Sequence, residues 1–251
     1  MFFSKSKDFL FIHIPKTAGT SLKLAFRPYG IDDPLTISAD PELSRFLENR
    51  PRHLVERGMA FPNHLGVRSV ARLTKLDLET LTIMSVVRDP WRRMQSLYRH
   101  IRRDKRHPYN AIAAGQALKG FVGHLLKRRQ DRPYVDTLPQ MDYLVDQSGR
   151  VGVDVILKQD SLEDGLHLLC RDLQISLELP RANASPEHQD APDAIDSETQ
   201  DMIADYEAGI IRLLGYQPGG RDGPFASKVL FRTNRKQGRQ KTASADFPGV
   251  D

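Results

Sequence analysis

A short loop near the N-terminus carries residue types suited to binding an anion. It follows an apolar run and combines one lysine, three hydroxyl side chains and one glycine in the order Pro15-Lys16-Thr17-Ala18-Gly19-Thr20-Ser21. Main-chain N–H groups of a tight turn and of a helix N-terminus converge on one point, hydroxyl groups add donors, and Lys16 adds a full positive charge. The loop therefore predicts a site for a phosphate-like group.

The order of residues in this loop differs from that of the nucleoside triphosphatases. Their loop has the pattern G-x-x-x-x-G-K-[ST], in which the lysine follows a glycine. Here Lys16 precedes Gly19, the only glycine of the loop, and no later strand-like run ends in the apolar-apolar-Asp pattern that holds magnesium. The sequence therefore predicts anion binding without the metal site of ATP hydrolysis.

A second group of basic and hydroxyl residues follows the apolar run at residues 81–87. Arg88 stands where this run ends, Asp89 is an N-cap, and Pro90 occupies the first helical position. Ser96 lies two turns into the expected helix, on its polar face. Because both strand-to-helix junctions lie at the same edge of a parallel sheet, we expect two neighbouring anion sites, which suits a ligand with two phosphate-like groups.

Two kinds of apolar pattern predict the strands and helices that position these loops. Short strand-like runs alternate with helical patterns, the former at residues 9–14, 81–87 and 153–157 and the latter at residues 20–26, 90–101, 111–127, 162–173 and 197–213. This alternation predicts an α/β fold, in which a doubly wound parallel sheet is flanked by helices in a single domain. The aperiodic, basic sequence that follows predicts a domain at 1–217 and a C-terminal tail or lid at 218–251.

The side-chain pattern makes further predictions within these segments. In the helix from residue 90, one face is apolar, formed by Trp91, Met94, Tyr98 and Ile101. Its arginines are expected mostly to face solvent or a bound substrate; they are Arg92, Arg93, Arg99, Arg102 and Arg103. Ser197 with Gln200 forms a capping box for the last helix. His13, inside a strand-like run, is expected to be a core histidine.

The composition excludes several classes of protein. The chain has 251 residues, of which 39% are hydrophobic and 27% charged, with a net charge of +5. This composition fits a globular protein that favours anionic ligands. Cys170 is the only cysteine, so an intramolecular disulfide cannot form. The apolar runs are far shorter than the roughly 20 residues that cross a bilayer, and the N-terminus lacks an apolar signal core. We therefore expect a cytoplasmic protein without an integral membrane segment.

Two long segments around the anion-binding loops resemble one family. Residues 11–22, FIHIPKTAGTSL, resemble the 5′-phosphosulfate loop, and residues 87–98, VRDPWRRMQSLY, resemble the 3′-phosphate motif, of the carbohydrate sulfotransferases related to heparan sulfate 2-O- and chondroitin sulfotransferases. Weaker similarity extends over most of residues 8–217. The resemblance implies a P-loop-like fold and a soluble, bacterial-type member that uses 3′-phosphoadenosine 5′-phosphosulfate (PAPS) as co-substrate and no metal. It also implies in-line transfer of the sulfuryl group to a hydroxyl of a carbohydrate or glycolipid acceptor.

The resemblance implies roles for individual residues. Those that bind the co-substrate would be Lys16, Thr17, Ala18, Gly19, Thr20, Ser21, Arg88 and Ser96. Lys16 would also stabilise the charge that develops in the transition state. The family places a histidine base between its two motifs, and here His64 is the candidate, with His53 less suitable. The acceptor side departs from the family pattern, because Gln159-Asp160-Ser161-Leu162 stands where many members have a glutamate before that leucine.

Two other functions stay open on the sequence alone. A phosphotransferase using ATP would share the fold class, but the residue order of the first loop and the missing magnesium aspartate argue against it. A non-enzymatic module for nucleic acid or another polyanion would suit the arginine-rich segment 88–106 and predicts strongly salt-dependent binding. That alternative leaves the Pro-Lys-Thr-Ala-Gly-Thr loop unexplained. We therefore expect a saccharide or glycolipid acceptor, and no nucleic acid, as the partner.

Overall fold

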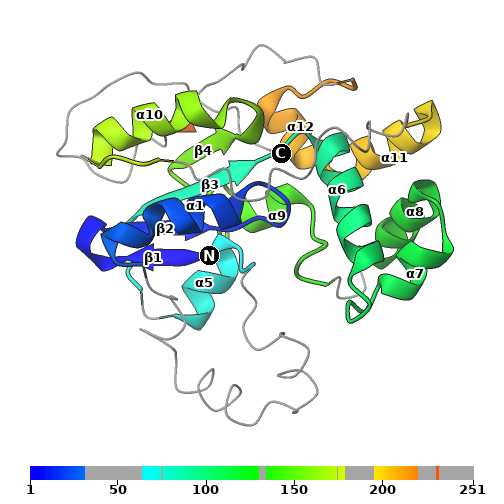
Figure 1. Ribbon diagram of the computed structural model, residues 1–251, viewed down its shortest axis with the longest axis horizontal. Helices are drawn as coiled ribbons and strands as arrows, with labels where there is room; N and C mark the ends of the chain where they lie inside the picture. Colours follow the sequence, from blue (N-terminus) through cyan, green and yellow to red (C-terminus); the bar gives the residue numbers. More distant parts are fainter. Residues whose placement is uncertain are drawn as a thin grey trace, which may run out of the picture.

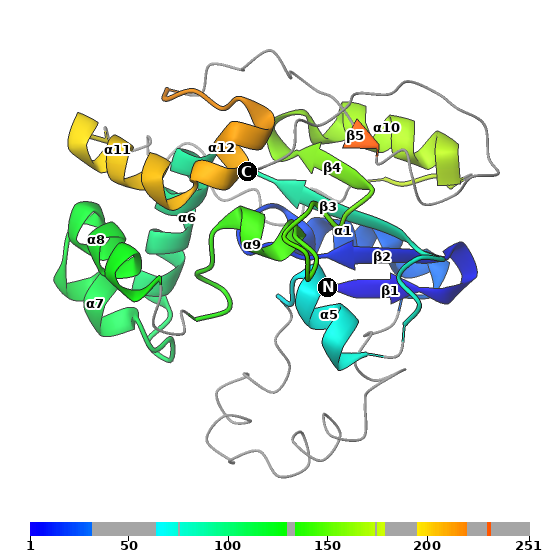
Figure 2. The same ribbon diagram turned by 180° about the vertical axis from the view of Figure 1, so that it is seen from behind.

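The structure is a computed structural model, which describes residues 1–31, 64–74, 76–129, 134–173, 175–178, 195–219 and 230–231. The described residues form one sheet of five strands in the order β1-β2-β3-β4-β5, with helices on both faces (Figures 1 and 2). This arrangement confirms the predicted α/β fold, with a parallel sheet centre flanked by helices in one domain. His53 and most of the predicted C-terminal tail lie outside the described residues.

Three parallel strands form the centre of the sheet, and each overlaps a predicted strand. They are β2 (Phe9–Ile12), β3 (Thr82–Val87) and β4 (Val155–Lys158). Ile12 lies opposite Ser85 in the register, and Val87 lies opposite Lys158. The loops that follow β2 and β3 therefore begin at the same edge of the sheet, as predicted for the two strand-to-helix junctions.

Two antiparallel edge strands make the sheet mixed. They are β1 (Phe2–Ser4), which pairs with β2, and β5 (Leu230–Phe231), which pairs with β4. With three and two residues, neither is long enough to give a periodic signal. β1 is nevertheless part of the core, because the ring of Phe2 stacks on that of Phe11 with 4.8 Å between centroids.

Alternating side chains of the strands separate two apolar cores. On one face, Phe9, Phe11, Met84 and Val86 pack with residues of two helices, α1 (Gly19–Phe26) and α10 (Leu162–Leu173). On the other face, Leu10, Ile12, Ile83 and Ile156 pack with the remaining helices. These are α5 (Val67–Leu73), α6 (Pro90–Arg103), α7 (Asn110–Gly115), α8 (Leu118–Arg128), α9 (Gln140–Leu144), α11 (Ser197–Tyr206) and α12 (Ala208–Leu214). Short 3₁₀ turns complete the described elements: η1 (Lys5–Lys7), η2 (Arg27–Tyr29) and η3 (Gln159–Ser161).

The start of α6 agrees with its prediction. The carboxylate of Asp89 accepts a hydrogen bond from the main-chain N–H of Arg92 at 2.8 Å, and Pro90 is the first helical residue. The predicted apolar face, formed by Trp91, Met94, Tyr98 and Ile101, is buried. Arg93 is the exception to the prediction for the arginines, because it is fully buried.

Two helical predictions are wrong in detail. The segment 111–127 forms two helices, since α7 ends at Gly115 and Gln116 is extended, with φ of −133° and its carbonyl accepting a hydrogen bond from the Tyr98 hydroxyl. The last helical segment is also divided, into α11 and α12. Its N-cap is Asp196, which accepts from the N–H of Thr199 at 2.9 Å, so Ser197 is the first helical residue and not the cap. The Asp196 carboxylate also accepts from the Thr199 hydroxyl at 2.7 Å, and this second bond holds it in the cap position.

Candidate functional site

The loop between β2 and α1 has an alternating backbone that suits anion binding. Lys16 and Ala18 adopt left-handed conformations, with φ of 69° and 67°, and Thr17 lies between them. Such alternation directs successive N–H groups to the same side, and the first N–H groups of α1 follow directly. The hydroxyl of buried Thr17 donates to the carbonyl of Ile14 at 2.8 Å, so this side chain shapes the loop while its N–H remains in the turn.

The first residue of α1 must be glycine for a steric reason. A Cβ added at Gly19 would lie 2.0 Å from both Cδ2 and Nε2 of His13. Half-buried His13 thus packs its ring against the helix start, rather than into the apolar core as the sequence predicts. The correction follows from β2 ending at Ile12, because the chain has left the strand when it reaches His13.

The second predicted junction meets the loop directly. Arg88 follows the last residue of β3, and its Nη1 donates to the carbonyl of Lys16 at 3.4 Å. Burial lowers the pKa of Lys16, and the nearby charges of Arg88 and Arg103 lower it further. Two partly buried cations at one sheet edge repel each other, and a bound anion would relieve that repulsion.

Ser96 lies on the face of α6 that runs beside this loop. It is half-buried, and the same helix face carries His100 and Arg103 one to two turns further on. Both of these basic side chains interact electrostatically with Lys16. The structure thus brings Lys16, Arg88 and the Ser96 face of α6 together.

His64 also lies beside the loop. Its Nδ1 is 2.9 Å from the carbonyl oxygen of His13, and the two imidazole rings lie 4.5 Å apart. A carbonyl only accepts hydrogen bonds, so Nδ1 carries the proton and Nε2 of the neutral ring is unprotonated. Burial lowers the pKa of His64 to about 4, against the smaller opposing effect of the bond to His13. His64 is therefore neutral at pH 7.

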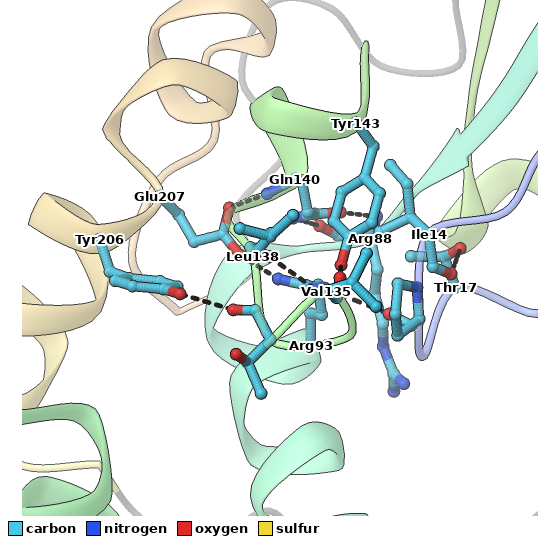
Figure 3. A network of polar contacts seen from close by, with 12 residues as sticks. Ile14, Thr17, Arg88, Arg93, Val135, Leu138, Gln140, Tyr143, Tyr206 and Glu207 are labelled. Atoms are coloured by element: carbon cyan, nitrogen blue, oxygen red, sulfur yellow. Dashed lines mark hydrogen bonds and ion pairs between the residues drawn. The ribbon is translucent and has the colours of Figure 1, made fainter. Parts of the chain in front are cut away.

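A buried polar network holds Arg88 in place (Figure 3). Gln140 accepts from the Arg88 main-chain N–H at 2.9 Å and donates to the Arg88 carbonyl at 3.0 Å. Glu207 accepts from the N–H of Gln140 at 2.8 Å and from Nη1 of Arg93 at 2.5 Å. Arg93 in turn donates from Nε to the carbonyl of Pro15 at 3.2 Å. Sequence reasoning missed this set of residues.

Arg92 faces solvent, as predicted for most arginines of α6. Arg92 forms a 3.4 Å ion pair with Asp160, and the two side chains are 56% and 34% exposed. Asp160 belongs to the segment that departs from the family pattern. Burial lowers the pKa of Arg88, and the charge of Asp160 opposes part of that lowering. This departure therefore places a negative charge near the second junction.

The fold and the site together define a class of protein: an α/β domain with two cationic strand-to-helix junctions at one edge of its sheet. The chain matches the profile of the Sulfotransferase family over residues 1–212 and belongs to that family. Neither a curated protein nor a solved structure matches the chain significantly. Membership confirms the resemblance at the level of the sulfotransferases, and with it a transferase that moves sulfuryl groups.

Two further findings bear on the described part of the chain. No helix there is long and apolar enough to cross a membrane. Nor do three His, Cys, Asp or Glu side chains of the described residues group in a way that could hold a metal ion.

Proposed function

We propose that the chain is a PAPS-dependent sulfotransferase that acts on a hydroxyl of a carbohydrate or glycolipid acceptor. The observation that carries the proposal is the contact of Arg88 with the carbonyl of Lys16. It brings two cationic junctions, 72 residues apart in sequence, to one edge of the sheet. PAPS has two separate anionic groups, the 5′-phosphosulfate and the 3′-phosphate, that match two such junctions.

The first junction would hold the 5′-phosphosulfate. Residues 16–21 supply main-chain N–H groups from the alternating turn and from the N-terminus of α1. Lys16 supplies a charge that is worth more there than in water, since it is partly buried. When bound, PAPS supplies an activated sulfuryl group at this point, and Lys16 would stabilise the negative charge that develops on its oxygens.

The second junction would hold the 3′-phosphate. Arg88 presents a guanidinium, which pairs well with phosphate oxygens, and Ser96 would add a hydroxyl donor from α6. Because the 3′-phosphate distinguishes PAPS from adenosine 5′-phosphosulfate, this junction would decide which of the two the protein selects.

His64 would accept the proton of the acceptor hydroxyl. Its Nδ1–H bond to the His13 carbonyl fixes the ring and leaves Nε2 as the acceptor atom. A pKa of about 4 keeps the imidazole neutral throughout the physiological range. The low pKa makes it a weaker base than an exposed histidine, and the proton taken up would pass readily to solvent.

Calorimetry with wild type and Arg88→Ala tests this proposal. PAP, the product left from PAPS, and adenosine 5′-phosphosulfate serve as the two ligands. Loss of a charge-assisted contact predicts that Arg88→Ala weakens PAP by about 10- to 100-fold and changes adenosine 5′-phosphosulfate by less than about threefold. Arg102→Ala, which removes an exposed arginine of α6, is the matched control and should keep both affinities. Equal losses for both ligands would contradict the assignment of Arg88.

Turnover of labelled PAPS against a panel of neutral and acidic saccharides and glycolipids tests the acceptor class. Transfer to at least one saccharide or glycolipid hydroxyl supports the proposal. Transfer only to other kinds of acceptor would overturn this part of it.

A further inference from the structure

Gln140 forms hydrogen bonds with the main chain of Arg88 rather than with its side chain. Its amide oxygen accepts from the Arg88 N–H and its amide nitrogen donates to the Arg88 carbonyl, at 2.9 and 3.0 Å. The Gln140 side chain is fully buried. Two bonds to one residue fix both the position and the tilt of that peptide segment, and hence the direction in which the Arg88 side chain leaves the sheet edge.

Glu207 holds Gln140 and Arg93 at once. One carboxylate oxygen accepts from the Gln140 N–H at 2.8 Å, and the other accepts from Nη1 of Arg93 at 2.5 Å. Neither Arg93 nor Glu207 has exposed side-chain surface. Burying two charges has a large desolvation cost that their attraction offsets only in part, so such a pair is weak evidence for stability alone. The contacts of the Arg93–Glu207 pair indicate instead that it positions the residues around it.

Arg93 extends the network to the first junction. Its Nε donates to the carbonyl of Pro15 at 3.2 Å, one residue before Lys16, and its Nη2 donates to the carbonyl of Leu138 at 3.0 Å. The contacts therefore form a closed ring, because the side chain of Arg88 returns to the carbonyl of Lys16. Figure 3 shows Gln140, Glu207 and Arg93 as one connected group of contacts beside Arg88.

We propose that Gln140, Glu207 and Arg93 are positioning residues that set the spacing between the 5′-phosphosulfate loop and the Arg88 guanidinium. The inference rests on the proposed function, and it assigns the selection of a donor with both anionic groups to this buried ring as well as to Arg88. The three residues act through Arg88 and Pro15 and do not themselves touch the donor.

The test compares PAP with adenosine 5′-phosphosulfate in Gln140→Met, which keeps the side-chain length and removes both bonds to Arg88. We expect the affinity for PAP to fall about tenfold, as a modest misplacement of a binding group would cause, and the affinity for adenosine 5′-phosphosulfate to change less than about threefold. Tyr206→Phe is the matched control, because it removes another buried hydrogen bond of the same region, from Tyr206 to the carbonyl of Thr137. It should keep the wild-type preference.

A double-mutant cycle separates positioning from a general structural effect. If Gln140 acts through Arg88, then Gln140→Met should weaken PAP by less than about twofold when Arg88 is already alanine. Additive losses, or a Gln140→Met protein with the wild-type preference, would overturn the inference while leaving the proposed function intact. A wild-type protein without any preference for PAP would instead overturn the proposed function. If Gln140→Met does not fold, Glu207→Gln is used in the same test. The glutamine side chain has a single carbonyl oxygen, which cannot replace both carboxylate contacts of Glu207.

Discussion

Replacing Gly19 by alanine should disturb the loop after β2 through one steric collision with His13. The added Cβ would lie 2.0 Å from Cδ2 and Nε2 of His13 and 2.7 Å from its Cγ. Real Cβ contacts are never closer than about 3.0 Å, so the ring must move by about 1 Å or the helix start must shift. The His13 ring has neighbours on other sides, since the rings of Phe11 and His64 lie 5.9 and 4.5 Å away.

The magnitude follows from overpacking a fixed ring. Inserting one methyl group into such a site costs about 1 to 3 kcal/mol of unfolding free energy. For a chain of this size, that loss lowers the melting temperature by about 2 to 10 °C. The affinity for PAP should fall as well, because the N–H groups at the start of α1 move with the displaced turn.

Urea unfolding and PAP calorimetry on wild type and four variants measure both effects. Gly115→Ala is the control, because a Cβ there meets nothing within 4 Å, and it should be close to neutral. In His13→Ala the obstructing ring is gone, so adding Gly19→Ala should cost about 1 kcal/mol less than it does in wild type. If the Gly19→Ala loss is the same with and without the His13 ring, the steric account of this glycine is wrong.

Three further predictions concern Lys16 and His64. Lys16→Ala should lower kcat by about 10²-fold or more, the effect of removing one preorganised donor, with a smaller loss of PAP affinity; a near-normal kcat would reduce the lysine to a binding role. His64→Asn should lower kcat by about 10² to 10⁴ in an assay limited by chemistry, with PAP affinity unchanged, whereas a rate within a few-fold of wild type would place the base elsewhere. Because the pKa of His64 is about 4 when folded and about 6.5 when unfolded, the unfolded chain binds more protons between these values, so the unfolding free energy should fall as the pH drops from about 6.5 towards 4. Urea titrations at several pH values should show this slope reduced in His64→Asn.

The parts of the site that are local in sequence could be predicted. Residues 15–21 are contiguous, so their types alone indicate an anion loop. The position of Arg88 follows from a strand end and an N-cap. The proximity of the two junctions follows from the parallel sheet.

The closed ring of hydrogen bonds through Arg88, Gln140, Glu207 and Arg93 could not be predicted in the same way. Hydropathy assigns a charged residue to solvent, and Arg93 has no partner nearby in sequence, since Glu207 is 114 residues away. One signal was available: Arg93 stands four residues before Leu97 and eight before Ile101, on the buried face of α6. The break between α7 and α8 gave no such signal, because the apolar spacing continues through Gln116.

The long sequence separation within the ring has a consequence for folding. Contacts between distant residues form only after the intervening chain is ordered, because closing long loops costs entropy. A growing chain that has reached the end of α10 already contains the three parallel strands, the loop and Arg93, but the counter-charge of Arg93 has yet to be made. Docking of α11 and α12 delivers Glu207, so we expect the sheet to form before the site acquires its working geometry. A nascent or damaged chain without those helices would then be largely structured and inactive. Its unfolding would start at Arg93, a buried cation without its counter-charge.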